Sequence, residues 1–221
     1  TQDGVTVKID TPAGERIVTV ERVLMAVGRR PNIDLEGLEA VGVKTDRRGI
    51  IVNERMQTSV PNIYAAGDVV GRHLLVNVAM KEAKVAASNL TGKDETMQYS
   101  VIPRCVFTIP EVASVGLIES QARDNGLDVK TVRMPFFNPR AAVVGEVEGF
   151  IKIITTGNEK IVGATIVGAY ASDLIFEFSL AIAKEIGALE MGEMMYPSPS
   201  FSEAIMNTLE KIGEEAIFGF S

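Results

Sequence analysis

The chain has 221 residues, of which 46% are hydrophobic, and carries a formal net charge of −7 at neutral pH. This length and apolar content suffice for one large domain or two small ones with a buried core. The acidic balance argues against nucleic acid or an anionic membrane as the main partner. No apolar run approaches the roughly 20 residues that a membrane-spanning helix needs.

The start of the chain and its cysteine content set two further expectations. The sequence begins at Thr1, shows no leader of basic and then apolar residues, and opens directly into an alternating stretch. We therefore expect a fragment of a longer protein. Cys105 is the only cysteine and cannot form an internal disulfide, which favours a reducing, cytoplasmic location.

The first segment predicts a β-hairpin. Residues 5–9 alternate between apolar and polar side chains, residues 11–14 (TPAG) form a turn, and residues 17–27 return as a second apolar strand. The hairpin closes on the sequence VGRRPN, which contains Gly28 and Arg29. Read from the residues alone, Gly28 is a turn glycine and Arg29 a solvated charge.

The stretch TSVPNIYAAGD at residues 58–68 predicts a short apolar strand that runs into a tight glycine turn and ends on Asp68. Small residues before Asp68 allow a flat or polyhydroxylated group to approach the backbone closely. A carboxylate at the carboxyl end of a strand can accept two hydrogen bonds from adjacent hydroxyls. The alternative is an ordinary strand-to-helix turn with a capping aspartate. Upstream we expect a helical turn at 35–43 and a strand at 50–52.

A helix is expected at 78–90, because apolar and small residues recur on one side and Thr91–Gly92 ends the pattern. The polar residues 92–99 indicate a linker and a domain boundary. Beyond the linker, short strands alternate with helices. This predicts an α+β domain, an antiparallel sheet with helices on one face. We expect strands at 101–109, 112–116, 129–134, 150–154 and 161–167, and helices at 119–125, from a cap at Ser172, and from about 201 to 217.

Several sequence motifs along the chain resemble those of one known protein family. The segment at 58–68 is similar to the T-x-x-x-x-[FY]-A-x-G-D motif of the FAD-dependent pyridine nucleotide–disulfide oxidoreductases, and VGRRPN lies just upstream of it. The rest of the chain contains four motifs in the order of the family's C-terminal dimerisation domain: PEVASVG, FNPRAAVVGEVEGFIKI, IVGATIVGAYASDLI and SFSEA. The resemblance covers nearly the whole chain, and within the family the chain resembles the dihydrolipoamide dehydrogenase branch.

The resemblance implies three parts and two cofactors. Residues 1–32 would end an NAD(P)-binding domain, residues 33–95 would complete an FAD-binding domain of α/β type, and residues 96–221 would form the dimerisation domain. Both cofactors would also need N-terminal parts that precede Thr1. The resemblance further implies a homodimer formed through residues after about 101. It assigns no metal. The cofactor-binding positions that it implies are Gly28 beside the nicotinamide, Gly67 and Asp68 at the ribityl chain of FAD, and Leu75, Val76 and Asn77 at the flavin.

The family's acid–base dyad departs from its pattern here. Members carry H-P-T-x-S-E, in which the histidine protonates a thiolate and the glutamate orients the histidine, a task that suits imidazole. The aligned residues place Ser198 at the histidine position and keep Glu203. Tyr196 could donate a hydrogen bond nearby, although a tyrosine pKa is ordinarily about 10. By the same resemblance the Ser198–Pro199 bond is expected to be cis.

The sequence is compatible with three hypotheses of function. The first is the C-terminal part of a flavoprotein that moves electrons from NAD(P)H through FAD to an acceptor. The second is a non-catalytic dimerisation or regulatory module. The third keeps the enzyme but changes the reaction to transhydrogenation or quinone reduction. For Glu203 a capping box with Ser200 is an alternative to a catalytic role. Cys105 and Arg140 are expected to be structural or solvated.

Overall fold

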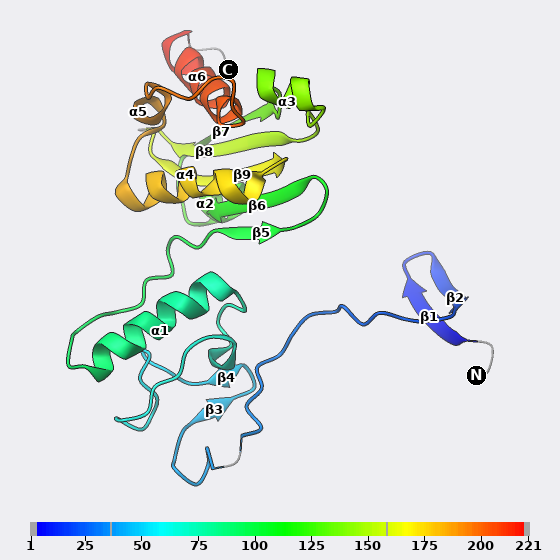
Figure 1. The fold of residues 1–221 in the computed structure, drawn as a ribbon, viewed down its shortest axis with the longest axis vertical. Coiled ribbons are helices and arrows are strands. Elements are labelled where there is room, and N and C mark those ends of the chain that lie inside the picture. Colours follow the sequence, from blue (N-terminus) through cyan, green and yellow to red (C-terminus); the bar gives the residue numbers. More distant parts are fainter. Residues whose placement is uncertain (1–3, 36, 158, 219–221) are drawn as a thin grey trace. The chain divides into compact units, whose positions relative to one another are not determined.

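The computed structural model describes residues 4–35, 37–157 and 159–218. The chain divides into two compact units, Thr1–Leu90 and Thr91–Ser221. Figure 1 shows the elements of each unit. Among the described residues, no helix has both the length and the apolar character that crossing a bilayer requires.

The N-terminal hairpin is confirmed, with a shorter second strand than expected. β1 (Val5–Thr11) pairs antiparallel with β2 (Gly14–Val20). The prediction that the second strand continues to residue 27 is wrong. Among the described residues no strand pairs with residues 21–27, and Leu24 there is 88% exposed. Apolar character alone does not make a strand, because a strand needs a neighbour that satisfies its backbone groups.

The middle of the first unit is built from turns. Residues 37–42 form successive turns within the stretch where a helical turn was expected, and β3 (Thr45–Asp46) pairs with β4 (Gly49–Ile50). The short helix η1 (Asp68–Val70) follows, then α1 (Val76–Leu90), which begins two residues before the predicted start. Backbone packs on backbone between β3–β4 and η1, since a Cβ on Gly71 would lie 1.6 Å from the carbonyl oxygen of Arg48.

The second unit contains one five-stranded antiparallel sheet in the order β5-β6-β9-β8-β7, as expected for an α+β fold (Figure 1). The strands predicted at 150–154 and 161–167 are confirmed as β8 and β9, which pair as an antiparallel hairpin with a register shift at Ile154/Thr155. The first strand is shorter than the predicted 101–109. The bounds are β5 (Arg104–Val106), β6 (Glu111–Gly116), β7 (Val129–Pro135), β8 (Phe150–Thr156) and β9 (Ile161–Gly168).

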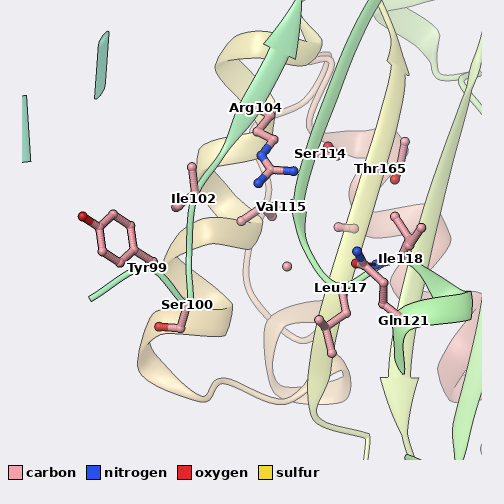
Figure 2. A pocket seen from close by; sticks show the side chains of 12 residues that line it. Tyr99, Ser100, Ile102, Arg104, Ser114, Val115, Leu117, Ile118, Gln121 and Thr165 are labelled. Carbon is pink, nitrogen blue, oxygen red and sulfur yellow. Dashed lines mark hydrogen bonds between the residues drawn. The ribbon is translucent and has the colours of Figure 1, made fainter. Parts of the chain in front are cut away.

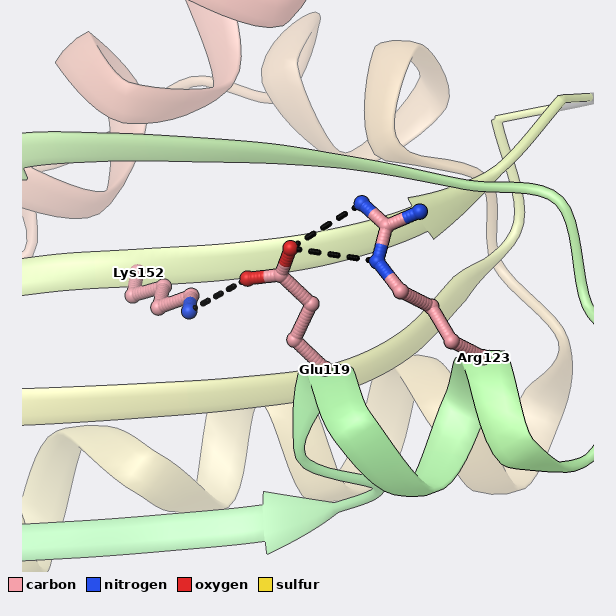
Figure 3. Close-up of polar contacts among 3 residues, drawn as sticks. All are labelled: Glu119, Arg123 and Lys152. Atoms are coloured by element: carbon pink, nitrogen blue, oxygen red, sulfur yellow. Dashed lines mark hydrogen bonds and ion pairs between the residues drawn. The ribbon is translucent and has the colours of Figure 1, made fainter.

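Helices cover both faces of this sheet, which corrects the expectation of one face. α4 (Ala171–Lys184) packs on β5, β6 and β9, and α6 (Glu203–Phe218) packs on β7 and β8. Ile151 and Ile153 of β8 point into that core, whereas Ile154 points to the opposite face and packs with Ala122 of α2 (Glu119–Asp124). Figure 3 shows α2 in front of the strands, with the other helices behind them.

Two short helices were not predicted, and one cap differs. α3 (Pro139–Val144) is capped by the preceding Asn138, whose Oδ1 accepts from the backbone N–H of Ala141 at 2.9 Å. α5 (Ala188–Gly192) lies between α4 and α6 in the sequence. Ser172 does not cap α4. The cap is Tyr170 in a left-handed conformation, and the N–H of Ser172 instead donates to Glu111 Oε2 of β6 at 2.9 Å.

Candidate functional site

The Asp68 turn is formed by a short return of the chain. The predicted strand is reduced to an isolated bridge between Gln57 and Tyr64, and the N–H of Ala65 donates to the carbonyl oxygen of Met56 at 3.1 Å. Gly67 then takes φ 82° and ψ −155°, a region that is essentially restricted to glycine. η1 begins at Asp68 directly after this glycine.

Gly67 sits against helix α1. A Cβ at Gly67 would lie 3.3 Å from the Cβ of Ala79, so the turn and the helix approach closely. The carboxylate of Glu82, one turn further along α1, accepts a hydrogen bond from the Gly67 N–H at 2.7 Å. Glu82 is only 1% exposed, and a buried carboxylate forms a strong bond to a backbone donor. Glu82 therefore fixes the backbone that carries Asp68.

Glu82 was not among the residues predicted for this site. A signal was present, because Glu82 falls at the spacing of Val78 and Val85 on the buried side of the helix. An acidic residue on an apolar stripe needs a buried partner. Which partner it finds depends on the fold, since Gly67 lies 15 residues away.

Arg29 lies against the same turn, contrary to its expected role as a solvated charge. Its Nη1 is 3.1 Å from Asp68 Oδ2, and its Nη2 donates to the carbonyl oxygen of Leu74. The side chain of Asp68 is 43% exposed. The contact with Arg29 is made through Oδ2, and a carboxylate has further lone pairs with which the half-exposed Asp68 can accept a hydrogen bond from the hydroxyl of a ligand.

The remaining predicted cofactor residues surround this turn along the chain. Leu75, Val76 and Asn77 stand at the start of α1, where the first backbone N–H groups have no partner within the helix. Val76 is 75% exposed. Gly28 adopts φ 119° next to Arg29, and nothing lies within 4 Å of where its Cβ would be. Through Arg29, the structure brings the VGRRPN segment, Asp68 and the residues before α1 together.

The second predicted site lies at the start of α6. The Ser198–Pro199 bond is cis, as expected. The Ser198 hydroxyl donates to Glu203 Oε1 at 2.7 Å, and the N–H of Ser200 donates to Oε2 at 2.7 Å. Glu203 is 7% exposed, so its carboxylate is held by these two donors inside the protein.

The predicted capping box is half formed. Glu203 accepts from the Ser200 N–H, which is one of its two reciprocal bonds. The hydroxyl of Ser200 is buried and has no hydrogen-bond partner among the described residues, so the other bond is missing. Glu203 thus links residues 198 and 200 and stabilises the turn that leads into α6.

Tyr196 is unsuited to act as an acid or base near neutral pH. Its hydroxyl donates to the carbonyl oxygen of Met191 at 3.2 Å. Burial, and to a smaller degree the charge of Glu177, raises the pKa of Tyr196 to about 12. Burial also raises the pKa of Glu177, opposed by a hydrogen bond from Ser202. Beside them lies an apolar cavity of about 410 Å³, lined in part by Leu180 and by methionine side chains.

The other candidate side chains have structural roles or no assigned role. Burial raises the pKa of the half-buried Cys105 thiol, which disfavours a reactive thiolate. Arg140 lines a hollow of about 460 Å³ together with Phe107 and Ile109, which are 78% and 99% exposed. Figure 2 shows a further pocket of about 410 Å³, into which Arg104 of β5 points.

Comparisons with known proteins agree with this arrangement. The model of the pyridine nucleotide-disulphide oxidoreductase family matches residues 1–83. The model of the dimerisation domain of the same family matches residues 102–209. The chain therefore belongs to the pyridine nucleotide-disulphide oxidoreductases, flavoproteins that use FAD and NAD(P).

Within the family, the curated relatives that it resembles include dihydrolipoyl dehydrogenases. That of Bacillus subtilis is 42% identical over 211 residues, 94% of this chain and 45% of the relative. That of Thermus scotoductus is 41% identical over 221 residues, 98% of this chain and 48% of the relative. The chain thus spans about half the length of these relatives.

Solved structures show the same fold. LpdA from Mycobacterium tuberculosis superposes with a TM-score of 0.86 at 29% identity, over 96% of this chain and 46% of that protein. RclA from Escherichia coli, a HOCl-induced flavoprotein disulfide reductase, superposes with a TM-score of 0.83 over 93% of this chain and 48% of that protein. At 24% identity the second likeness supports the fold alone.

Proposed function

We propose that this chain is the C-terminal half of a flavoprotein that transfers electrons from NAD(P)H through FAD to an acceptor, similar to dihydrolipoyl dehydrogenase. Residues 1–32 would end the NAD(P)-binding domain, residues 33–95 would complete the FAD-binding domain, and residues 96–221 would form the dimerisation domain. We place the protein in the cytoplasm, a reducing compartment in which an unpaired cysteine such as Cys105 is stable.

The Asp68 turn is the observation that carries this proposal. Gly67 has no side chain where it meets α1, and the side chain of Asp68 is 43% exposed although it pairs with Arg29. In the proposed site Asp68 accepts hydrogen bonds from ribityl hydroxyls, and the backbone N–H groups of Leu75, Val76 and Asn77 face the flavin. Gly28 lies beside the nicotinamide. The flavin, when bound, supplies the hydride and electron transfer, and these residues bind and orient it.

The acceptor side supports a reaction other than ordinary lipoamide reduction. Ser198 stands where imidazole would act, and its hydroxyl is engaged with Glu203. Tyr196, with its raised pKa, does not replace imidazole. Glu203 in this proposal holds the turn and transfers no proton. Transhydrogenation or the reduction of a quinone needs no proton donor to a leaving thiolate, so either reaction fits these residues better.

The residues at 196 and 198 are also compatible with a second function, which is not enzymatic. A dimerisation or regulatory module without redox function would also tolerate Ser198 and a buried Tyr196. The gene's upstream sequence separates the two classes. Two cysteines in C-x-x-x-x-C spacing there would contradict the module and would support a disulfide acceptor.

The direct test uses the full-length protein. We expect it to purify with bound FAD, to oxidise NADH or NADPH with a quinone or the second nicotinamide nucleotide, and to reduce lipoamide poorly. Ser198→His should raise lipoamide reduction only if the upstream cysteine pair exists. A colourless full-length protein that does not take up FAD would refute the proposal. The 221-residue chain alone, with one wall of the site, should bind FAD weakly.

We also propose that the second unit forms a homodimer, with Glu203 near the interface. Exposed apolar side chains such as Phe107 and Ile109 would be covered by a partner. Light scattering after gel filtration should give the mass of a dimer at micromolar concentration. Phe107→Asp should shift the equilibrium towards the monomer, whereas Lys130→Asp, at an exposed position of β7, serves as a surface control. A monomer at these concentrations would contradict the dimer.

A further inference from the structure

Arg29 joins two parts of the proposed flavin site that are separate in sequence. One nitrogen of its guanidinium pairs with Asp68 Oδ2 at 3.1 Å, and another donates to the carbonyl oxygen of Leu74, directly before the residues that start α1. The planar guanidinium presents its donors in a fixed geometry. The two acceptors are therefore held at a fixed separation by one side chain.

This ion pair contributes little to folding. The side chains of Arg29 and Asp68 are 61% and 43% exposed, and exposed ion pairs add little to stability. The backbone of the turn is already held from the other side by Glu82, which accepts from the Gly67 N–H. What Arg29 adds is the orientation of the Asp68 carboxylate, a half-exposed group that could otherwise rotate.

We propose that Arg29 is a positioning residue of the flavin site, which sets the Asp68 carboxylate for the ribityl hydroxyls and ties it to the backbone entering α1. This inference rests on the proposed function. With Oδ2 in contact with Arg29, the exposed part of the Asp68 carboxylate would accept from the ribityl hydroxyls. Because Arg29 follows Gly28 directly, the segment assigned to the nicotinamide also takes part in orienting the flavin.

The experiment measures FAD dissociation constants of the full-length protein by flavin fluorescence. Arg29→Met should weaken FAD binding about tenfold, as expected when a charge-assisted contact that orients a ligand group is lost. Arg29→Lys keeps the charge without the planar geometry and should recover part of the loss. Arg30→Met is the matched control, since Arg30 is the exposed neighbour, and it should bind FAD as the wild type does.

A double-mutant cycle shows whether Arg29 acts through Asp68. If it does, Arg29→Met in an Asp68→Asn background should change FAD binding less than twofold further, whereas an independent structural role would give multiplied effects. Circular dichroism should show the same helix content in all variants. Wild-type FAD affinity in Arg29→Met, or multiplied effects in the double variant, would overturn the inference. If Asp68→Asn alone leaves binding unchanged, the proposed flavin site itself fails.

Discussion

Replacing Gly67 with alanine tests whether the turn that carries Asp68 is held as the structure shows it. The residue has φ 82° and ψ −155°, and an added Cβ would lie 3.3 Å from the Cβ of Ala79. A non-glycine residue in this backbone region costs about 1–3 kcal/mol. The contact with Ala79 requires a further shift of a few tenths of an ångström. We therefore expect Gly67→Ala to destabilise the first unit by about 2 kcal/mol, roughly thirty-fold in its opening equilibrium.

Hydrogen exchange measured by mass spectrometry shows which of the two units loses stability in Gly67→Ala. The amides of α1 should exchange roughly thirty-fold faster, because the helix loses the turn that packs on it. The amides of β8 in the second unit should exchange as in the wild type. Gly126→Ala is the matched control. Gly126 also has a left-handed φ of 75°, nothing lies within 4 Å of its Cβ position, and it belongs to the second unit.

The two glycines should give opposite patterns. Gly126→Ala should speed exchange around α2 and leave α1 unchanged. Exchange of α1 within twofold of wild type in Gly67→Ala would refute the reasoning, because the turn would then relax without cost. Equal acceleration in both units would refute the assignment of the strain to this turn.

Three further predictions concern buried and paired carboxylates. Glu82→Ala leaves the Gly67 N–H without its acceptor and should destabilise α1 by about 1–3 kcal/mol in the same exchange measurement. Ser198→Ala removes one donor to the buried Glu203 and should lower the melting temperature of the second unit, whereas Ser198→Thr should keep it. Hydrogen bonds from Lys152 and then Arg123 lower the pKa of Glu119 from 4.5 to about 2 (Figure 3). This contribution is complete above pH 4.5 and is lost as the pH falls towards 2, so the melting-temperature difference between wild type and Glu119→Gln should shrink between pH 5 and pH 2.

Local patterns predicted the regular elements well. The β8–β9 hairpin and the helices α1, α4 and α6 follow from alternation, helical spacing and end signals that lie within a few residues of one another. The motif that ends on Asp68 was recognisable for the same reason, since a glycine turn and an acidic residue are read from adjacent positions. Residues 21–27 have the composition of a strand but no neighbouring strand among the described residues, so the local pattern predicted a second strand that is too long.

The contacts that complete the candidate site could not be predicted in this way. Glu82 reaches Gly67 across 15 residues, and Arg29 reaches Asp68 from a different segment. The N-cap of α4 is Tyr170, and the N–H of Ser172 donates to Glu111 of β6, which lies 61 residues away in the sequence, so the prediction that Ser172 caps the helix was wrong. The second face of the sheet was missed because α2 is too short for its apolar side to be recognised. Each of these contacts depends on the tertiary fold, which local propensity does not encode.

The turn before α6 keeps the structural role of the family's glutamate–histidine pair but lacks the histidine that would transfer a proton. Its shape depends on Glu203, whose two oxygens are bonded to Ser198 and to the N–H of Ser200, and no imidazole is needed for either bond. A buried carboxylate requires such donors, and Ser198 supplies one of them. Serine at this position therefore preserves the fold of the turn while removing the group that titrates near neutral pH. It follows that the retained glutamate reflects the architecture of the family's turn and does not require acid–base chemistry.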